Sequence, residues 1–166
     1  MSLREIVQYS LWFLLYLALQ ILVMRNLVLF DYAFCFVYIA GVLLLPAETN
    51  RTALLLIGFV TGIAVDVFYN TLGMHAAATL LVAYLRPALI RLQFEAKGAD
   101  RTISIQALGI GSYITFLFSL VLVHHSALFL IEMSHFGMVL YTLLRIVASS
   151  IFTTVVILLF QFFSRR

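Results

Sequence analysis

Six long apolar runs divide this chain, and they constrain its fold more than any other feature. A helix needs about 20 mostly apolar residues to cross the hydrocarbon core of a bilayer. Apolar residues make up 64% of the chain, and Asp, Glu, Lys and Arg together only 10%. Soluble domains are usually about 45–50% apolar and about 25% charged, so a globule of this composition could not cover its own surface. The runs predict an all-α polytopic membrane protein with about six transmembrane helices in one bundle, at about residues 6–24, 33–46, 52–69, 74–92, 103–131 and 138–163.

The connections between these runs are short, so residues 1–166 are expected to form a single integral membrane domain. The first run is too long for a signal-peptide core and no small-x-small cleavage site follows it, which predicts a retained helix. The second run is short, and Pro46 marks its expected end. All the runs are continuously apolar rather than alternating, which excludes a membrane β-barrel.

The basic residues predict the orientation of the bundle. With six crossings and a cytoplasmic N-terminus, only Arg25 and Arg145 fall toward the outside or within the membrane. Loops that face the cytoplasm carry an excess of Lys and Arg, so both termini are predicted to be cytoplasmic. The cations are spread between apolar runs and form no basic patch, so no nucleic-acid partner is expected. The residues predicted to face the cytoplasm are Arg4, Arg51, Arg86, Arg91, Lys97, Arg101, Arg165 and Arg166.

Small residues and one acid share a face of the third predicted helix. Gly58, Gly62 and Asp66 are spaced four residues apart, and two glycines at that spacing let another backbone approach closely. Gly73 follows in the turn before the next helix. One interpretation is packing between these two helices, with Asp66 capping or hydrating the turn at 70–73. The other makes Asp66 a buried electrostatic anchor within the bundle or at a partner helix. The matching small face of the next helix consists of Ala76, Thr79 and Ala83.

A polar stripe runs along the sixth predicted helix and includes Arg145 and Ser149. Polar groups on a membrane helix are expected to face protein rather than lipid. Arg145 then needs an acid, and the hypothesis ranks Asp66 first; the alternative is that Arg145 snorkels alone to the lipid headgroups. The other members of the stripe are Thr142 and Thr153, and the other acids on the outer side are Glu132 and Asp31.

The remaining polar residues predict neither catalysis nor a cofactor. His124 and His125 point about 100° apart on a helix, so they cannot share one metal ion, and they are expected in the outer interfacial zone, bonded to backbone or lipid. No nucleophile elbow, phosphate loop or zinc motif is present, so we expect no enzyme, no metal and no cofactor. Arg86 and Arg91 flank Pro87 and are interpreted as snorkelling cations at a helix end, in contact with anionic lipid.

The stretch GFVTGIAVDVFYNTLGMHAAATLLVAYLRP, residues 58–87, resembles the rod shape-determining protein MreD family. That family has a glycine-spaced helix ending in an acid, then a short turn and a glycine; here these are Gly58, Gly62, Asp66 and Gly73. The segments VLLLPAETNR, HHSALFLIEMSHFG and TLLRIVASSIFTT are also similar to the family. The resemblance implies a non-enzymatic scaffold of the cell-elongation machinery, which maintains rod shape and peptidoglycan synthesis in the bacterial inner membrane. Its implied partners are the membrane helix of an MreC-type bitopic protein, the MreB cytoskeleton, a SEDS glycosyltransferase and a monofunctional transpeptidase.

The same resemblance supplies an alternative function. The family is thought to share its fold with the substrate-binding subunits of energy-coupling-factor vitamin transporters, so the alternative is a small-molecule uptake subunit. Such subunits carry an A-x-x-x-A docking face on their first helix. Here the first helix reads LWFLLYLALQ, with Ala18 alone, which counts against the transporter.

Overall fold

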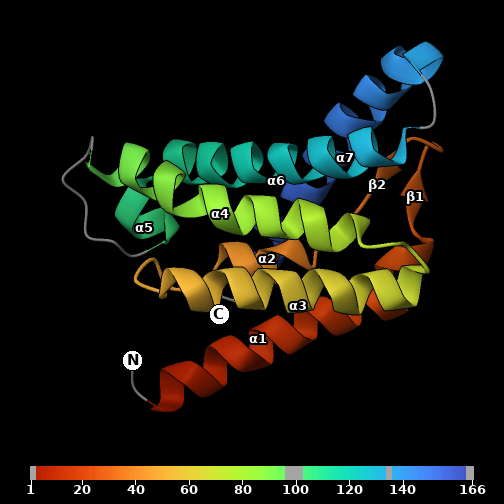
Figure 1. The fold of residues 1–166 in the computed structure, drawn as a ribbon. Helices are drawn as coiled ribbons and strands as arrows, with labels where there is room; N and C mark the ends of the chain where they lie inside the picture. Colours follow the sequence, from red (N-terminus) through yellow and green to blue (C-terminus); the bar gives the residue numbers. More distant parts are fainter. Residues whose placement is uncertain (1–2, 96–102, 134–135, 164–166) are drawn as a thin grey trace.

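The computed structural model describes residues 3–95, 103–133 and 136–163, and almost all of this part is helical (Figure 1). The elements in chain order are α1 (Leu3–Leu22), η1 (Met24–Asn26), β1 (Val28–Leu29), β2 (Ala33–Phe34), α2 (Ile39–Leu43), α3 (Arg51–Tyr69), α4 (Met74–Glu95), α5 (Ile105–Leu108), α6 (Ile110–Glu132), η2 (Phe136–Met138) and α7 (Val139–Phe163). The two short strands form one antiparallel hairpin.

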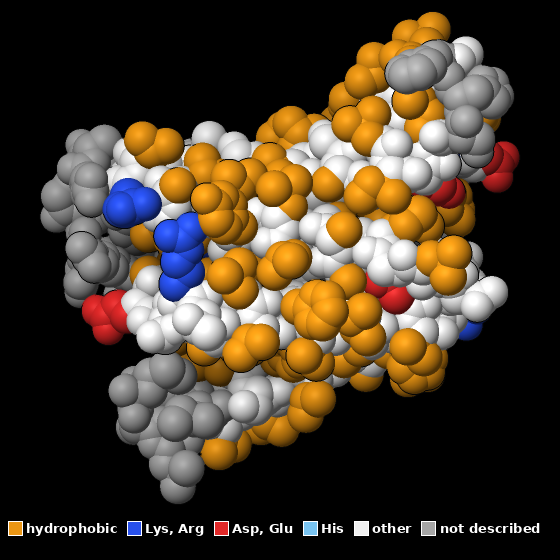
Figure 2. Space-filling model, in the orientation of Figure 1, with side chains coloured by type: hydrophobic (Ala, Val, Ile, Leu, Met, Phe, Trp, Pro, Cys, Tyr) orange, Lys and Arg blue, Asp and Glu red, His pale blue; other side chains and the backbone are white. Residues whose placement is uncertain are grey.

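Four helical segments in the described residues are long and apolar enough to cross a membrane: Val7–Asn26, Arg51–Tyr69, Ile110–Glu132 and Val139–Phe163. Figure 2 shows hydrophobic side chains over the middle of one face of the molecule, with the charged side chains toward its two ends. An apolar band bounded by charge is the surface expected of a bilayer-embedded protein. The chain is therefore an all-α membrane protein in its architecture.

The central helix of the bundle, α4, is not one of these four segments. It lies between α3 and α6, and it packs against both (Figure 1). A helix with protein on two sides does not need a uniformly apolar surface, because its polar side chains find partners inside the bundle. This position explains how His75, Thr79 and Arg86, all buried, fit on one helix.

The predicted second helix, residues 33–46, is wrong as a single helix. The chain pairs as strand β2, passes through two residues without regular structure and a turn, and only then forms the five-residue helix α2. Residues 35–43 are buried throughout. Non-helical backbone at membrane depth is tolerated only where protein covers it and satisfies its polar groups. The surrounding helices must therefore supply hydrogen bonds that a regular helix would have made for itself.

Two other predicted boundaries also differ. The fifth run is split at Gly109, whose φ of +75° ends α5 and starts α6. The fourth helix, predicted to end at about residue 92, continues to Glu95, with Pro87 inside it. Four basic residues used to predict the orientation lie outside the described residues: Lys97, Arg101, Arg165 and Arg166.

Candidate functional site

The Tyr38 hydroxyl stands at the centre of a buried polar cluster that joins three parts of the bundle. It lies 3.1 Å from His75 Nδ1, 3.0 Å from Thr79 Oγ1 and 2.7 Å from His124 Nε2. All four side chains are at most 2% exposed. A hydroxyl carries one donor and two acceptor positions, so three partners use its full capacity. Tyr38 thereby connects the segment before α2 to both α4 and α6.

Two side chains of α7 replace the missing partners of the non-helical segment. Ser149 Oγ accepts a hydrogen bond from the Phe34 amide at 2.9 Å and donates to the Tyr32 carbonyl at 3.4 Å. Thr153 Oγ1 accepts from the Phe36 amide at 3.1 Å and donates to the Phe34 carbonyl at 3.3 Å. The polar stripe of α7 therefore faces protein, as expected. It supplies hydrogen-bond partners to the backbone of residues 32–36.

Gln20 of α1 holds the other side of the same segment. Its Nε2 donates to the Cys35 carbonyl at 3.0 Å and to the Tyr69 hydroxyl at 2.6 Å, and its Oε1 accepts from the Tyr38 amide at 3.3 Å. Gln20 is fully buried. A buried amide that satisfies three groups at once attaches α1 to the core by directed bonds as well as by apolar contact.

Arg86 is not a snorkelling cation, and this corrects the interpretation from sequence. It is 0% exposed, and its guanidinium donates to the backbone carbonyls of Leu43, Leu45 and Pro46, with Nε 3.1 Å from the Leu43 oxygen. The Leu43 carbonyl is the last of α2, where a helix leaves its final carbonyls without partners, and Leu45 and Pro46 follow directly after the helix. Arg86 therefore caps α2, while Arg91 is exposed.

The glycine face of α3 is placed against the small face of α4. A Cβ on Gly62 would come within 2.3 Å of Ala76 Cα, and one on Gly58 within 3.0 Å of Ala83 Cβ. The two backbones approach as closely as the first interpretation requires, so this face is inside the bundle. Gly73, in the turn between the two helices, has a φ of +82°, a backbone conformation that residues other than glycine rarely adopt.

Asp66 caps α4. Its Oδ1 accepts from the His75 amide at 3.0 Å and from the Thr71 hydroxyl, and its Oδ2 accepts from the Ala76 amide at 2.9 Å. The first amide groups of a helix have no partner within the helix, and a carboxylate at that end also complements the helix dipole. The capping interpretation thus describes the position of Asp66.

Arg145 pairs with Glu132 and not with Asp66, so the first-ranked hypothesis is wrong. Arg145 Nη2 lies 3.0 Å from Glu132 Oε2, and the two side chains are 16% and 43% exposed. The Arg145 guanidinium also lies 4.8 Å from the ring centre of Phe34 and 4.4 Å from that of Phe129. The arginine is therefore held between aromatic faces next to the hairpin, which is a favourable setting for a partly desolvated cation.

Both adjacent histidines are fully buried, which corrects their expected place at the interface with lipid. His125 Nδ1 lies 2.8 Å from the Val121 carbonyl, and its Nε2 lies 3.2 Å from Thr153 Oγ1. His124 faces Tyr38. Within the described residues no group of three potential metal ligands gathers.

Sequence reasoning did not select Gln20, Tyr38 or His75, and it named Thr153 only as a member of the polar stripe. The available signal was a polar group inside an apolar run, which in a membrane protein marks a functional or structural partner by default.

Comparison of the chain with models of known protein families gave no match, and neither did comparison with curated proteins or with solved structures. The class of the protein, a helical membrane protein with buried polar side chains around a non-helical segment, follows from its own residues and geometry.

Proposed function

We propose that this chain is a non-enzymatic membrane scaffold of the bacterial cell-elongation complex, similar to the rod shape-determining protein MreD family. In this role it would bind the membrane helix of an MreC-type bitopic protein in the inner membrane. The MreB cytoskeleton, a SEDS glycosyltransferase and a monofunctional transpeptidase would complete the larger complex.

The observation that supports a scaffold is the use made of the interior polar groups. Ser149, Thr153 and Gln20 bond to the chain's own backbone, and Tyr38 bonds to side chains of two helices. Buried hydrogen bonds between separate elements restrict how those elements can be arranged, and these bonds join α1, α4, α6 and α7 to one segment. A rigid body with an apolar outer surface is well suited to hold partner helices in fixed positions.

The proposed topology has six crossings with both termini in the cytoplasm, and the buried segment 33–46 makes the second crossing. Figure 1 draws the start of α1 and the loop between α2 and α3 toward one end of the bundle. The β1–β2 turn and the α3–α4 turn lie toward the other end. Arg51 and Arg91 belong to the first end, and this distribution supports a cytoplasmic assignment for it.

Because Gly58, Gly62 and Asp66 are used within the bundle, partner binding falls to other surfaces in this proposal. α1 is the best candidate, since most of its side chains before Tyr16 are exposed and it contacts the bundle less than the other long helices do.

One observation favours the alternative, a small-molecule uptake subunit. A hollow of about 400 Å³ lies beneath α1 and is lined by Gln8, Trp12, Tyr16 and Gln161 among others. Aromatic rings and amides around a hollow of this size are typical of small-ligand sites.

Affinity purification of the tagged chain from native membranes in mild detergent tests the proposal. Recovery of a bitopic elongation protein is the expected result. Recovery of a transporter ATPase pair without any elongation protein would replace the scaffold by the uptake subunit.

A further inference from the structure

The hollow of about 400 Å³ beneath α1 is enclosed by four separate parts of the chain. The first half of α1, the small helix α2, Ile103 before α5, and Gln161 near the end of α7 all contribute to its lining. Its volume lies within the roughly 300–1,000 Å³ of small-ligand sites. Such a site takes a ligand whose shape and polar groups match the side chains around it.

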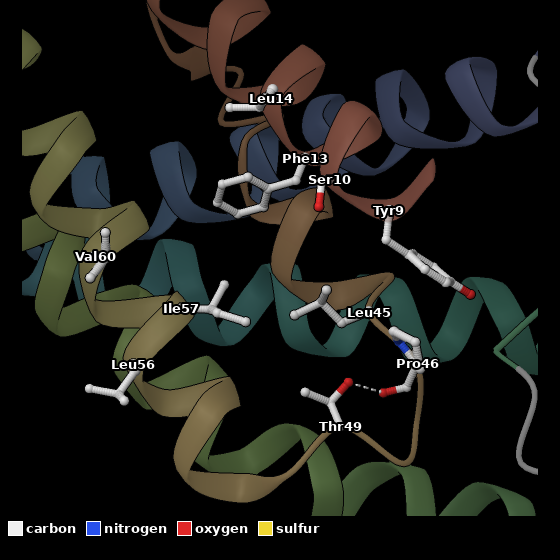
Figure 3. A pocket seen from close by; sticks show the side chains of 10 residues that line it. All are labelled: Tyr9, Ser10, Phe13, Leu14, Leu45, Pro46, Thr49, Leu56, Ile57 and Val60. Atoms are coloured by element: carbon white, nitrogen blue, oxygen red, sulfur yellow. Dashed lines mark hydrogen bonds between the residues drawn. The ribbon is translucent and has the colours of Figure 1, made fainter. Parts of the chain in front are cut away.

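A second space beneath α1 differs from this hollow. It is a groove between α1 and α3, lined mainly by apolar side chains such as Leu14, Leu56 and Val60 (Figure 3). Tyr9 and Phe13 line both spaces, and Figure 3 shows their rings extending from α1 in different directions. Any apolar occupant fits the groove, whereas polar side chains select the occupant of the hollow.

Two polar side chains of the hollow are bonded to each other and keep further hydrogen-bonding capacity. Gln161 Nε2 donates to the Tyr16 hydroxyl at 3.1 Å. Tyr16 is only 1% exposed, yet no group in the described part of the chain accepts its O–H. No described group donates to Gln161 Oε1 either. The pair therefore offers a ligand one donor, the Tyr16 O–H, and one acceptor, the Gln161 amide oxygen.

The aromatic rings of the hollow are held in place by one another. The Trp12 and Tyr16 ring centres lie 6.1 Å apart, with their planes tilted by 34°. Phe160 of α7 packs nearly perpendicular to the Tyr16 ring, at 6.3 Å between centres. Aromatic rings favour other flat rings as neighbours, stacked or edge to face. A flat ring is therefore the apolar part that this lining fits best.

None of the described side chains that line the hollow carries a charge. Its polar groups are hydroxyls, the indole N–H of Trp12, and the amides of Gln8 and Gln161. A charged ligand that leaves water for a site without an opposite charge pays a large desolvation cost. The lining therefore selects a neutral molecule.

We propose that this hollow binds a small neutral molecule in which a flat ring carries an amide-like group, with a hydrogen-bond acceptor beside a donor. The ring lies against Trp12 and Tyr16, the acceptor receives the Tyr16 O–H, and the donor bonds to Gln161 Oε1. Gln8 lies near the start of α1 and Gln161 near the end of α7, so the molecule enters at that end of the bundle. The inference is independent of the scaffold function, and it names the ligand class that the uptake alternative requires.

The test is a titration of the purified full chain in mild detergent with benzamide, benzoate and benzamidine. These three molecules share one ring and are neutral, anionic and cationic at pH 7. Trp12 is the only tryptophan of the chain, so its fluorescence reports on the hollow. We expect benzamide to change this fluorescence saturably and to bind about tenfold or more tightly than either charged analogue, because a charge finds no partner in the lining.

Two variants locate the binding site. Gln161→Leu removes the amide and is expected to abolish the saturable change. Gln106→Leu is the matched control, because Gln106 is exposed on α5 and does not line the hollow, and it should bind benzamide like the wild-type chain. Leu44→Phe adds bulk to the wall at α2 and should also abolish binding, which tests the site if Gln161→Leu does not fold. Thermal unfolding shows whether each variant is folded.

Three results would overturn the proposal: no saturable response to benzamide in the wild-type chain, equal affinity for all three molecules, or unchanged benzamide binding in the folded variants of the hollow. Each of them would also remove the observation that favours the uptake alternative. None would bear on the scaffold, which the recovery of a bitopic elongation protein tests separately.

Discussion

Gly62 lies so close to Ala76 that a single added carbon would reach the neighbouring backbone, 2.3 Å from the Ala76 Cα. Backbone cannot move aside as a flexible side chain can, so α3 and α4 keep this spacing only with glycine at position 62. The contact also brings the C-terminal part of α3, which carries Asp66, to the start of α4, where Asp66 caps the helix.

The first prediction follows from this contact. Gly62→Ala should lower the free energy of unfolding by about 3 kcal/mol, because overpacking a closely packed contact costs about 1–3 kcal/mol or more. Thermal unfolding in detergent measures the effect. The matched control is Gly111→Ala in α6, where nothing lies within 4 Å of the added Cβ, and which should be neutral or slightly stabilising. Equal stability of the two variants would mean that α3 and α4 can move apart at little cost to accept the added Cβ.

The second prediction concerns the polar cluster at Tyr38. Tyr38→Phe removes one hydroxyl and leaves polar groups of His75, Thr79 and His124 without that partner in the interior. Each unsatisfied buried group costs about 1–3 kcal/mol, and partial rearrangement should keep the total loss of stability near 3 kcal/mol. Tyr16→Phe is the control: among the described residues the Tyr16 hydroxyl has one hydrogen-bond partner, Gln161 at 3.1 Å, so the substitution should cost about 1 kcal/mol. A smaller loss for Tyr38→Phe than for Tyr16→Phe would contradict the central role of the cluster.

The third prediction tests the partner of Arg145. A double-mutant cycle with Arg145→Gln and Glu132→Gln should give a coupling energy of about 0.5 kcal/mol, small because the glutamate is 43% exposed. Arg145→Gln alone should cost more than Glu132→Gln alone, because it also removes the contacts with Phe34 and Phe129. The cycle of Arg145→Gln with Asp66→Asn should show no coupling. A measurable coupling energy in that second cycle would support an ion pair between Arg145 and Asp66 and would contradict the structure.

The fourth prediction concerns the cap of α4. Asp66→Ala removes the acceptor of the His75 and Ala76 amides and should cost about 2 kcal/mol, the upper part of the range for helix caps. Asp31→Asn is the control, since Asp31 is exposed in the hairpin turn at a φ of +61°, which asparagine adopts equally well. A loss of stability no larger than that of the control would show that water replaces the carboxylate at this position.

The fifth prediction tests the proposed topology. After Cys35 is replaced, a cysteine at position 48 should be protected from a membrane-impermeant thiol reagent added outside the cell, and a cysteine at position 72 should react. Leu72 is fully exposed in the α3–α4 turn, and Glu48 is exposed in the loop before α3. Positions 97 and 166, outside the described residues, should also be protected, and position 134 should react. Reaction at both 48 and 72 would contradict an odd number of crossings between them.

The amino-acid sequence alone determined that this chain belongs in a bilayer and that α3 and α4 meet through small residues. Both properties are local: apolar content is additive along a run, and a four-residue spacing places side chains on one helix face. The non-helical path of residues 33–38 was decided only by tertiary structure, because its hydrogen bonds come from Thr153, 117 residues from Phe36, and from Gln20. Partners so far apart along the chain produce no periodic pattern in the sequence. The same holds for Arg86 and Arg145. A buried arginine needs hydrogen-bond acceptors, but the sequence did not indicate that Arg86 would bind backbone carbonyls or that Arg145 would bind Glu132. In a membrane interior every polar group requires a partner, and three-dimensional proximity selects it.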